Sequence, residues 1–466
     1  MWLYLAAVLG YLAALAAVGV WRARAAEPAT GDDVLVARRT LPAHVLVLTL
    51  LSAWIGSGSL FGGAGLGYRV GLAALWQSAG AWAGIAIVFF IAPRVRRLAQ
   101  YSVPDILELR YGAPARGLGT LAIVIAYTAI AAYQFRGGGR LLHLVAGVDP
   151  DAGAVITAVF CVLFTSLAGM RSVARLDVVN GATILVGVAI AIVYLLGAAG
   201  GLGGASASLR PDQLTVFGTL SPRQAVALFL PTMCLLLGEA SIYQKFASAR
   251  DERATRIAVA GWIIGTVVVE VLIVAIGVLG SLRLPGLSVA DSEGIVVRVA
   301  VGVLPALLGA LLLAAAAAIV VSAANSMLLV AASNLVRDVY QRSVNRTASE
   351  RQIVLAMRAV IGLLAVAGLL GGSLFPSVLA VALWAYTMYG AGITPALLAA
   401  LLWPRTTKEA GVYSIAAGMT VTLLWELAAV ARGSVAAPAY LLGVQSIYPA
   451  LLASIAALVG VTLARR

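Results

Sequence analysis

Hydroxyl, amide and carboxyl side chains lie inside apolar stretches of this chain, where they are costly to bury and usually serve a function. One stretch carries Ser322, Asn325 and Ser326, whose three- and four-residue spacing places them on one face of a helix. Hydroxyl and amide oxygens are suitable ligands for a hard cation. The same side chains also form hydrogen bonds between membrane helices, so both interpretations stand.

Acidic residues also occur within the apolar runs. Asp177 is expected at the start of a helix, where it serves either as an N-cap or as part of a site. Glu239 is a site candidate, with an ion pair to Lys245 as the alternative. Glu270 and Glu426 are interpreted as packed structural carboxyls, and proton carriage is the alternative for both.

The stretch from 46 to 67, LVLTLLSAWIGSGSLFGGAGLG, is apolar enough to span a bilayer, yet glycines and serines interrupt its middle. Glycine disfavours a helix interior by about 1 kcal/mol relative to alanine. A spanning helix broken near its centre is typical of transporters, because the break exposes carbonyls to a bound ion or solute. Close helix packing through small residues is the alternative. The density of glycines beside hydroxyls favours a binding site.

The composition indicates an integral membrane protein. The chain has 466 residues, of which 62% are hydrophobic and 11% charged, whereas soluble domains have about 25% charged residues. The net charge of +13 comes from short loops between apolar runs, which argues against nucleic-acid binding. The sequence shows no nucleophile–base pair and no metal-ligand spacing of cysteines. We therefore expect neither an enzyme nor a cofactor.

Runs of about 20 apolar residues predict thirteen spanning helices. They lie near 2–21, 43–66, 70–92, 117–138, 152–170, 177–200, 221–245, 256–281, 299–335, 352–371, 374–403, 411–431 and 444–463. About three quarters of the Lys and Arg residues follow the odd-numbered helices. The positive-inside rule then places the N-terminus outside and the C-terminus in the cytoplasm of a plasma-membrane protein.

Helices two to six and seven to eleven form two sets of five, and an odd-numbered unit repeated once must be inverted in the membrane. The first helix of the second set is also interrupted, by Pro231 and Gly238. Interrupted helices at corresponding positions of two halves point to a transporter site. The predicted organisation is one all-α membrane domain over 1–466: an extra helix and loop in 1–40, two five-helix repeats in 41–200 and 221–403, and two helices in 410–466.

The chain resembles the solute:sodium symporter family, which includes sugar, proline, pantothenate and sialic acid carriers. The likeness covers nearly the whole chain in the expected order. It rests on IGSGSLFGGAGLGYRVGLA, YSVPDILELRYG, LAGMRSVARLDVVNG, GEASIYQKFASARDERATR, SAANSMLLVAASNLVRDVY and YGAGITPALLAALLWPRTTKEAGVYSIAAG. The resemblance implies a LeuT-type fold, with a five-plus-five inverted repeat, one helix before it and two after.

The resemblance also implies ligand sets. A sodium site would use the backbone carbonyls of Ser52, Ile55 and Ile319 and the hydroxyl of Ser322, while Ala323 stands where the family usually has a second hydroxyl. A second sodium seen in some members would map onto Asp177, Ser322, Asn325 and Ser326. The solute site would map onto Trp54, Gly58, Ser59, Gln77, Tyr133, Glu239 and Tyr386.

The expected function is inward symport of a small organic solute with Na⁺, by alternating access in the lipid bilayer. Na⁺ is expected as the coupling ion, and no other cofactor is expected. A proton-coupled or ion-independent carrier on the same fold is the alternative. A membrane sensor is disfavoured, because the chain ends at Arg466 without an output domain.

Overall fold

The computed structural model describes residues 2–25, 39–98, 102–167, 170–373, 375, 377–432, 440–441 and 443–465. Residues 26–38, which include Arg38 among the arginines that follow the first predicted helix, and the terminal Arg466 lie outside these residues.

The described residues are almost entirely helical. The first half contains α1 (Trp2–Ala25), α3 (Ala43–Trp54), η2 (Gly58–Gly63), α4 (Ala64–Val70), η3 (Gly71–Ala74), α5 (Leu75–Leu98), α6 (Val103–Tyr111), α7 (Ala113–Ala146), α8 (Pro150–Leu167), α9 (Met170–Ala198), α10 (Gly201–Ser208) and η4 (Pro211–Leu214). The second half contains α11 (Pro222–Gly238), α12 (Ala240–Ser248), α13 (Glu252–Arg283), α14 (Val289–Ser292), α15 (Ile295–Gly302), α16 (Ala306–Leu335), η5 (Val336–Val344), α17 (Glu350–Gly372), α18 (Val378–Gly392), α19 (Thr394–Leu402), α20 (Lys408–Ala431), a hairpin of β1 (Tyr440–Leu441) and β2 (Val444–Gln445), and α21 (Ile447–Ala464).

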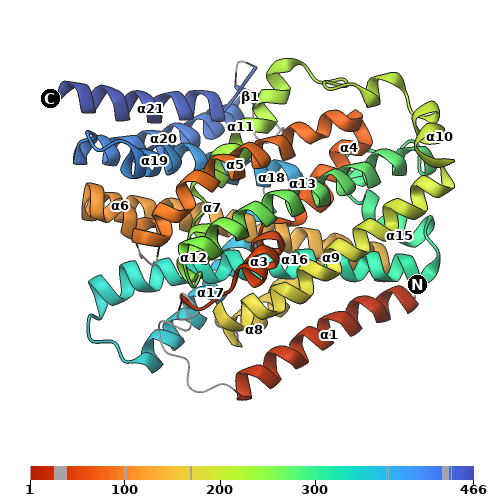
Figure 1. Ribbon diagram of the computed structural model, residues 1–466, viewed down its shortest axis with the longest axis horizontal. Helices are drawn as coiled ribbons and strands as arrows, with labels where there is room; N and C mark the ends of the chain where they lie inside the picture. Colours follow the sequence, from red (N-terminus) through yellow and green to blue (C-terminus); the bar gives the residue numbers. More distant parts are fainter. Residues whose placement is uncertain are drawn as a thin grey trace.

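Long helices run side by side as a bundle, with α1 along one edge and α20 and α21 along the opposite edge (Figure 1). Within the described residues, 10 helical stretches are long and apolar enough to cross a membrane. The helix order is consistent with the predicted thirteen spans when the halves of interrupted helices are joined. α1 begins at one end of the bundle and α21 ends at the other, as an odd number of crossings requires (Figure 1).

Ion pairs join loops that the sequence places on the same side. Arg97, after the third predicted helix, pairs with Glu252, after the seventh, at 3.0 Å between Nε and Oε1. Asp105 Oδ2 pairs with Arg337 Nη1 at 2.5 Å, which connects the loop after the third helix to the region after the ninth. These contacts support the alternation of the predicted crossings.

Three details of the predicted helices were wrong. The run 299–335 is two helices, because the chain turns before Pro305 and α16 begins at Ala306. Pro231 lies inside α11 and does not end it. Asp177 does not open a helix: α9 begins seven residues earlier, at Met170, so the N-cap interpretation of Asp177 is excluded.

The predicted break in the first core helix is confirmed. α3 ends at Trp54, Ile55 is extended with φ −69° and ψ 106°, and the helix resumes as the π-helical turn η2. The buried Gln134 side chain of α7 accepts a hydrogen bond at its Oε1 from the backbone nitrogen of Ser57, at 2.8 Å. A protein side chain thus replaces a lost helical bond, which is the condition for unwound backbone at membrane depth.

The glycines of this stretch permit close approach of other groups both at the break and beyond it. A Cβ on Gly56, at the break, would lie 2.5 Å from Gln134 Nε2, so glycine lets the capping amide approach. A Cβ on Gly67, beyond the break, would lie 2.8 Å from the carbonyl oxygen of Val274, so that glycine permits close packing of α4 on α13.

A second break separates α11 from α12 at Glu239, which is extended with φ −60° and ψ 115°. Two buried tyrosines satisfy the backbone there. Tyr389 Oη donates to the carbonyl of Gly238 at 2.5 Å, and Tyr127 Oη accepts from the backbone nitrogen of Ser241 at 3.1 Å. The two halves of the chain therefore each contain an interrupted helix, as the sequence predicted.

Candidate functional site

Three predicted ion ligands from three helices meet beside the first break. Ser322 of α16 donates from Oγ to Asp177 Oδ1 of α9 at 2.6 Å, and its Oγ lies 2.6 Å from Ser52 Oγ at the end of α3. Since a hydroxyl has one proton, Ser52 donates to Ser322 in this arrangement. All three residues are at most 1% exposed, and Asp177 Oδ2 is buried without a hydrogen-bond partner. A buried carboxylate oxygen with no donor is a position that a cation can fill.

The residues whose backbone carbonyls the resemblance implies as ion ligands lie at the same place. The last carbonyls of a helix have no intrahelical donor, and α3 ends at Trp54, two residues after Ser52. Ile55 is fully buried in the extended segment that follows. Ile319 is also fully buried and precedes Ser322 by one turn of α16. The predicted carbonyl ligands therefore lie on the two elements that carry the serine pair.

The remaining predicted ion ligands have protein partners of their own. Asn325 Oδ1 accepts from Thr165 Oγ1 of α8 at 2.8 Å. Ser326 Oγ accepts from Lys245 Nζ of α12 at 3.4 Å, and this lysine is only 1% exposed. An ammonium so close to Ser326 repels a second cation at that position.

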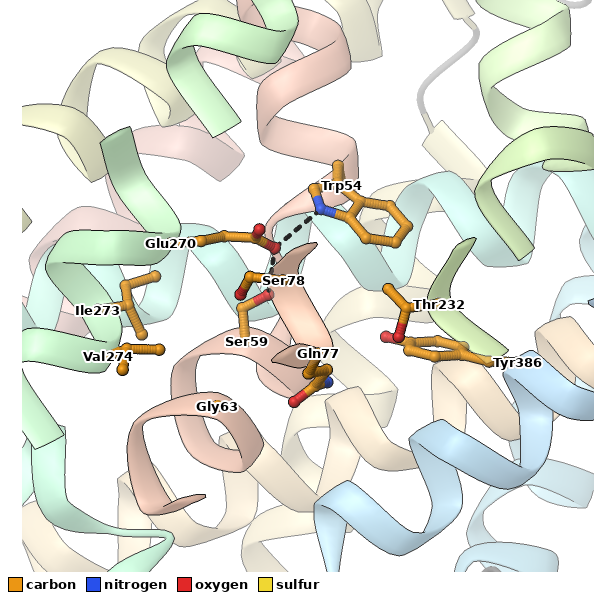
Figure 2. Close-up of a pocket in the computed structure, with 10 residues that line it drawn as sticks. All are labelled: Trp54, Ser59, Gly63, Gln77, Ser78, Thr232, Glu270, Ile273, Val274 and Tyr386. Atoms are coloured by element: carbon orange, nitrogen blue, oxygen red, sulfur yellow. Dashed lines mark hydrogen bonds between the residues drawn. The ribbon is translucent and has the colours of Figure 1, made fainter. Parts of the chain in front are cut away.

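A small cavity lies on the other side of the break, between η2, α5, α11, α13 and α18 (Figure 2). Trp54, Ser59, Gln77 and Tyr386, four of the predicted solute residues, line it. The cavity has a volume of about 10 Å³, which is room for one water. The cavity must widen before it admits an organic solute.

Glu270, interpreted from the sequence as a packed structural carboxyl, lines the cavity. Its carboxylate is 3% exposed and accepts hydrogen bonds from Trp54 Nε1 at 3.0 Å and Trp82 Nε1 at 2.9 Å, one on each oxygen. Ser59 Oγ donates to the first oxygen at 3.4 Å, and Figure 2 shows Glu270 and Trp54 pointing toward each other across the cavity. The position of this acid in the middle of a spanning helix indicated a functional group. Its partners could not be named from the sequence, because they come from other helices.

The other predicted solute residues surround the cavity without lining it. Tyr133 Oη lies 3.1 Å from Tyr386 Oη, and a Cβ on Gly58 would lie 2.9 Å from that same Tyr386 oxygen. Glu239 is buried at the second break, where its Oε1 accepts from Ser241 Oγ at 2.5 Å and its Oε2 has no partner. Glu239 and Lys245 form no direct ion pair, although the lysine interacts electrostatically with both Glu239 and Asp177.

The fold is shared with solved membrane transporters. The structure superposes on a Na⁺-coupled sialic acid symporter in a substrate-bound outward-open state with a TM-score of 0.83, at 18% identity over 99% of this chain and 97% of that one. It superposes on MhsT in complex with L-phenylalanine with a TM-score of 0.57, at 16% identity over 91% and 98% of the two chains. These likenesses define the class: an all-α membrane transporter of the LeuT-type fold.

Residues 35–418 match the Sodium:solute symporter family, and the chain belongs to this family. It is 27% identical to the sodium/pantothenate symporter of Escherichia coli over 288 residues, which span 59% of this chain and 59% of that relative. It is 26% identical to the high-affinity proline transporter PutP of Bacillus subtilis over 379 residues, 77% and 79% of the two chains. It is 23% identical to the human high affinity choline transporter 1 over 83% of this chain and 68% of that one. The expectation of a sodium-coupled solute transporter, and not an enzyme, is confirmed by this membership.

Proposed function

We propose that this protein moves a small organic solute into the cell with Na⁺, and that the ion binds where Ser52, Asp177 and Ser322 meet. The observation that carries the assignment is the unpartnered Asp177 Oδ2 beside the serine pair. The carbonyls of Ile55 and Ile319 complete a set of oxygen ligands, which is the chemistry a hard cation prefers.

The solute is assigned to the cavity beyond the break, between Trp54, Gln77 and Tyr386. Ion and solute then share one interrupted helix: Ser52 contributes to the ion site, and Trp54, two residues later, lines the solute cavity. Na⁺ drives transport by binding the outward-open state better than the inward-open state, because only a difference in affinity shifts the populations.

The orientation and domain organisation complete the proposal. The basic loops place the N-terminus outside and the C-terminus in the cytoplasm. Segments 41–200 and 221–403 act as the two inverted repeats, with 1–40 and 410–466 flanking them. The interrupted helices α3–α4 and α11–α12 lie at corresponding positions of these segments, which supports this division.

Proton coupling is the second candidate, and two observations favour it. Ala323 follows Ser322, so the usual second hydroxyl is missing from the ion site. Lys245 lies near enough to Asp177 to interact with it electrostatically, and a resident ammonium supplies part of the positive charge that Na⁺ would otherwise bring.

Uptake into proteoliposomes distinguishes the two candidates. Labelled pantothenate, proline and choline, the solutes named for the relatives, are offered with an inward Na⁺ gradient or with K⁺ in its place, at constant pH. Sodium coupling predicts uptake only with Na⁺. Full uptake with K⁺ refutes it, and uptake that follows an imposed proton gradient establishes the second candidate.

Ion binding is measured separately, without any solute. Titrating Na⁺ against K⁺ at constant ionic strength should raise the unfolding temperature of the purified protein, because a ligand at 100 times its Kd stabilises by about 2.7 kcal/mol. Asp177→Asn should remove this effect. An equal response to both ions would contradict a sodium site.

A further inference from the structure

The cavity contains one formally charged side chain, and that charge is negative. Its lining consists of Trp54, Ser59, Gly63, Gln77, Ser78, Thr232, Glu270, Ile273, Val274 and Tyr386. Glu270 is the acid, and no Lys, Arg or His is among these residues. The solute therefore meets a carboxylate and no basic group.

The contacts of Glu270 fit its ionised form. The three hydrogen bonds from Trp54, Trp82 and Ser59 are all donated to it, and a carboxylate is the form that only accepts. Among the described residues, no ion pair compensates this charge. A buried carboxylate without a counter-charge is strongly unfavourable and is relieved by a proton or by a cation, so a cationic solute is stabilised in this cavity.

One polar atom of the cavity lining lacks a hydrogen-bond donor. Gln77 is 5% exposed, and its Oε1 is buried without a hydrogen-bond partner. Thr232 Oγ1 donates its proton to the carbonyl oxygen of Leu228 at 3.1 Å, so toward the cavity this hydroxyl can only accept hydrogen bonds. These two oxygen atoms therefore favour a solute that donates hydrogen bonds.

The rest of the wall suits an organic cation. The rings of Trp54 and Tyr386 lie 6.4 Å apart at an interplanar angle of 29°, on the side of the cavity across from Glu270 (Figure 2). Aromatic faces attract cations, most strongly where water is excluded. Ile273 and Val274 supply the apolar surface that the carbon skeleton of such a solute needs.

We propose that the transported solute carries an organic ammonium group, which binds against the Glu270 carboxylate and the Trp54 and Tyr386 rings and is oriented by Gln77 Oε1. The inference rests on the proposed function, in that it takes this cavity as the solute site. It excludes solutes whose only charge is a carboxylate, because Glu270 would repel them and nothing basic in the lining would hold them.

The test uses ligands of equal shape and different charge. Choline, its neutral carbon isostere neohexanol and the anion of tert-butylacetic acid form one set, and butylammonium, butanol and butyrate form a second set with a primary ammonium. Binding to the purified protein is measured by calorimetry and by thermal unfolding, in NaCl at constant ionic strength. In at least one set the cation should bind about 30-fold or more tightly than its neutral partner, the size expected for a buried charge pair.

Variants locate the effect. Glu270→Gln should lose that preference, Glu270→Asp should keep part of it because the charge remains, and Glu426→Gln, which removes a carboxyl on α20 outside the cavity, should change nothing. Because the ligand sets are read on the unaltered protein, the test does not depend on the folding of a variant.

The outcomes separate this inference from the sodium proposal. Neutral or anionic members that bind as tightly as the cations overturn the ammonium assignment, and so does the absence of binding by either cation, even if Na⁺ still stabilises the protein. Cation binding that survives while Na⁺ has no effect supports the ammonium assignment and refutes the sodium site instead.

Discussion

Replacing Ser322 with alanine removes the hydroxyl at the centre of the proposed ion site. In the structure its Oγ bonds to both Asp177 and Ser52, at 2.6 Å each. Alanine leaves the carboxylate without its donor and deprives Na⁺ of one of its oxygen ligands. The site keeps its charge and its carbonyls, so the variant should weaken sodium binding without abolishing it.

The size of the loss follows from the chemistry of the contact. A hydrogen bond to a charged group is worth about 1.5–3 kcal/mol, and about 1.4 kcal/mol corresponds to a tenfold change in affinity. The Na⁺ concentration for half-maximal uptake should therefore rise about 10- to 100-fold in Ser322→Ala. The maximal rate at saturating Na⁺ should change less, because the solute cavity is intact.

Ser414→Ala is the matched control. Ser414 Oγ lies 2.9 Å from Ser454 Oγ in a buried pair that joins α20 to α21, away from the proposed site. The substitution is chemically identical, so it corrects for the general cost of deleting a buried hydroxyl. If the two variants shift the Na⁺ dependence of uptake equally, or if neither does, Ser322 is not an ion ligand.

Three further substitutions test separate parts of the site. Asp177→Asn neutralises the carboxylate bonded to Ser322 and should raise the half-maximal Na⁺ concentration by about 30-fold or more. An unchanged value would show that this carboxylate does not face the ion. Gln134→Ala leaves the buried Ser57 N–H without an acceptor and should lower the free energy of unfolding by about 1–3 kcal/mol. Gln134→Glu keeps an acceptor, so thermal unfolding should show that this variant retains most of the wild-type stability. Gly58→Ala places a methyl group 2.9 Å from Tyr386 Oη and displaces the phenol, so half-saturation of uptake should need several-fold more solute, and wild-type kinetics would mean that the phenol is not part of the solute site.

The bundle was predictable because lipid imposes one simple rule on the sequence. Each span needs a long apolar run, and the loops between spans concentrate arginine. The alternation of apolar runs and basic loops along the chain was therefore enough to locate the spans. The rule fails where a helix continues beyond its apolar run. α9 starts at Met170, before the apolar residues begin, so an acid that looked like a cap lies well inside a helix. Likewise, the apolar run across Pro305 hides a turn between α15 and α16.

The site was only partly predictable, for a different reason. The break and the Ser322 face could be proposed from glycine content and helical spacing, both of which are local properties, whereas Ser52 entered the predicted ion site through the family resemblance and by its carbonyl. Glu270 could not be interpreted correctly, because its role depends on Trp54 and Trp82, which approach it from α3 and α5. Gln134 is a similar case: nothing near it in the sequence indicates that it caps the break in another helix.

The break in the first core helix explains why ion and solute binding should depend on each other. Ser52 and the backbone after it form one face of the proposed ion site, and Trp54, the last residue of the same helix α3, donates to Glu270 in the proposed solute cavity. An ion that fixes the conformation of this helix end also fixes the indole, so part of the ordering cost of solute binding has already been met. The dependence is reciprocal by thermodynamic necessity: the factor by which Na⁺ raises solute affinity equals the factor by which the solute raises Na⁺ affinity. The coupling therefore needs no long pathway, since three consecutive residues connect the two sites.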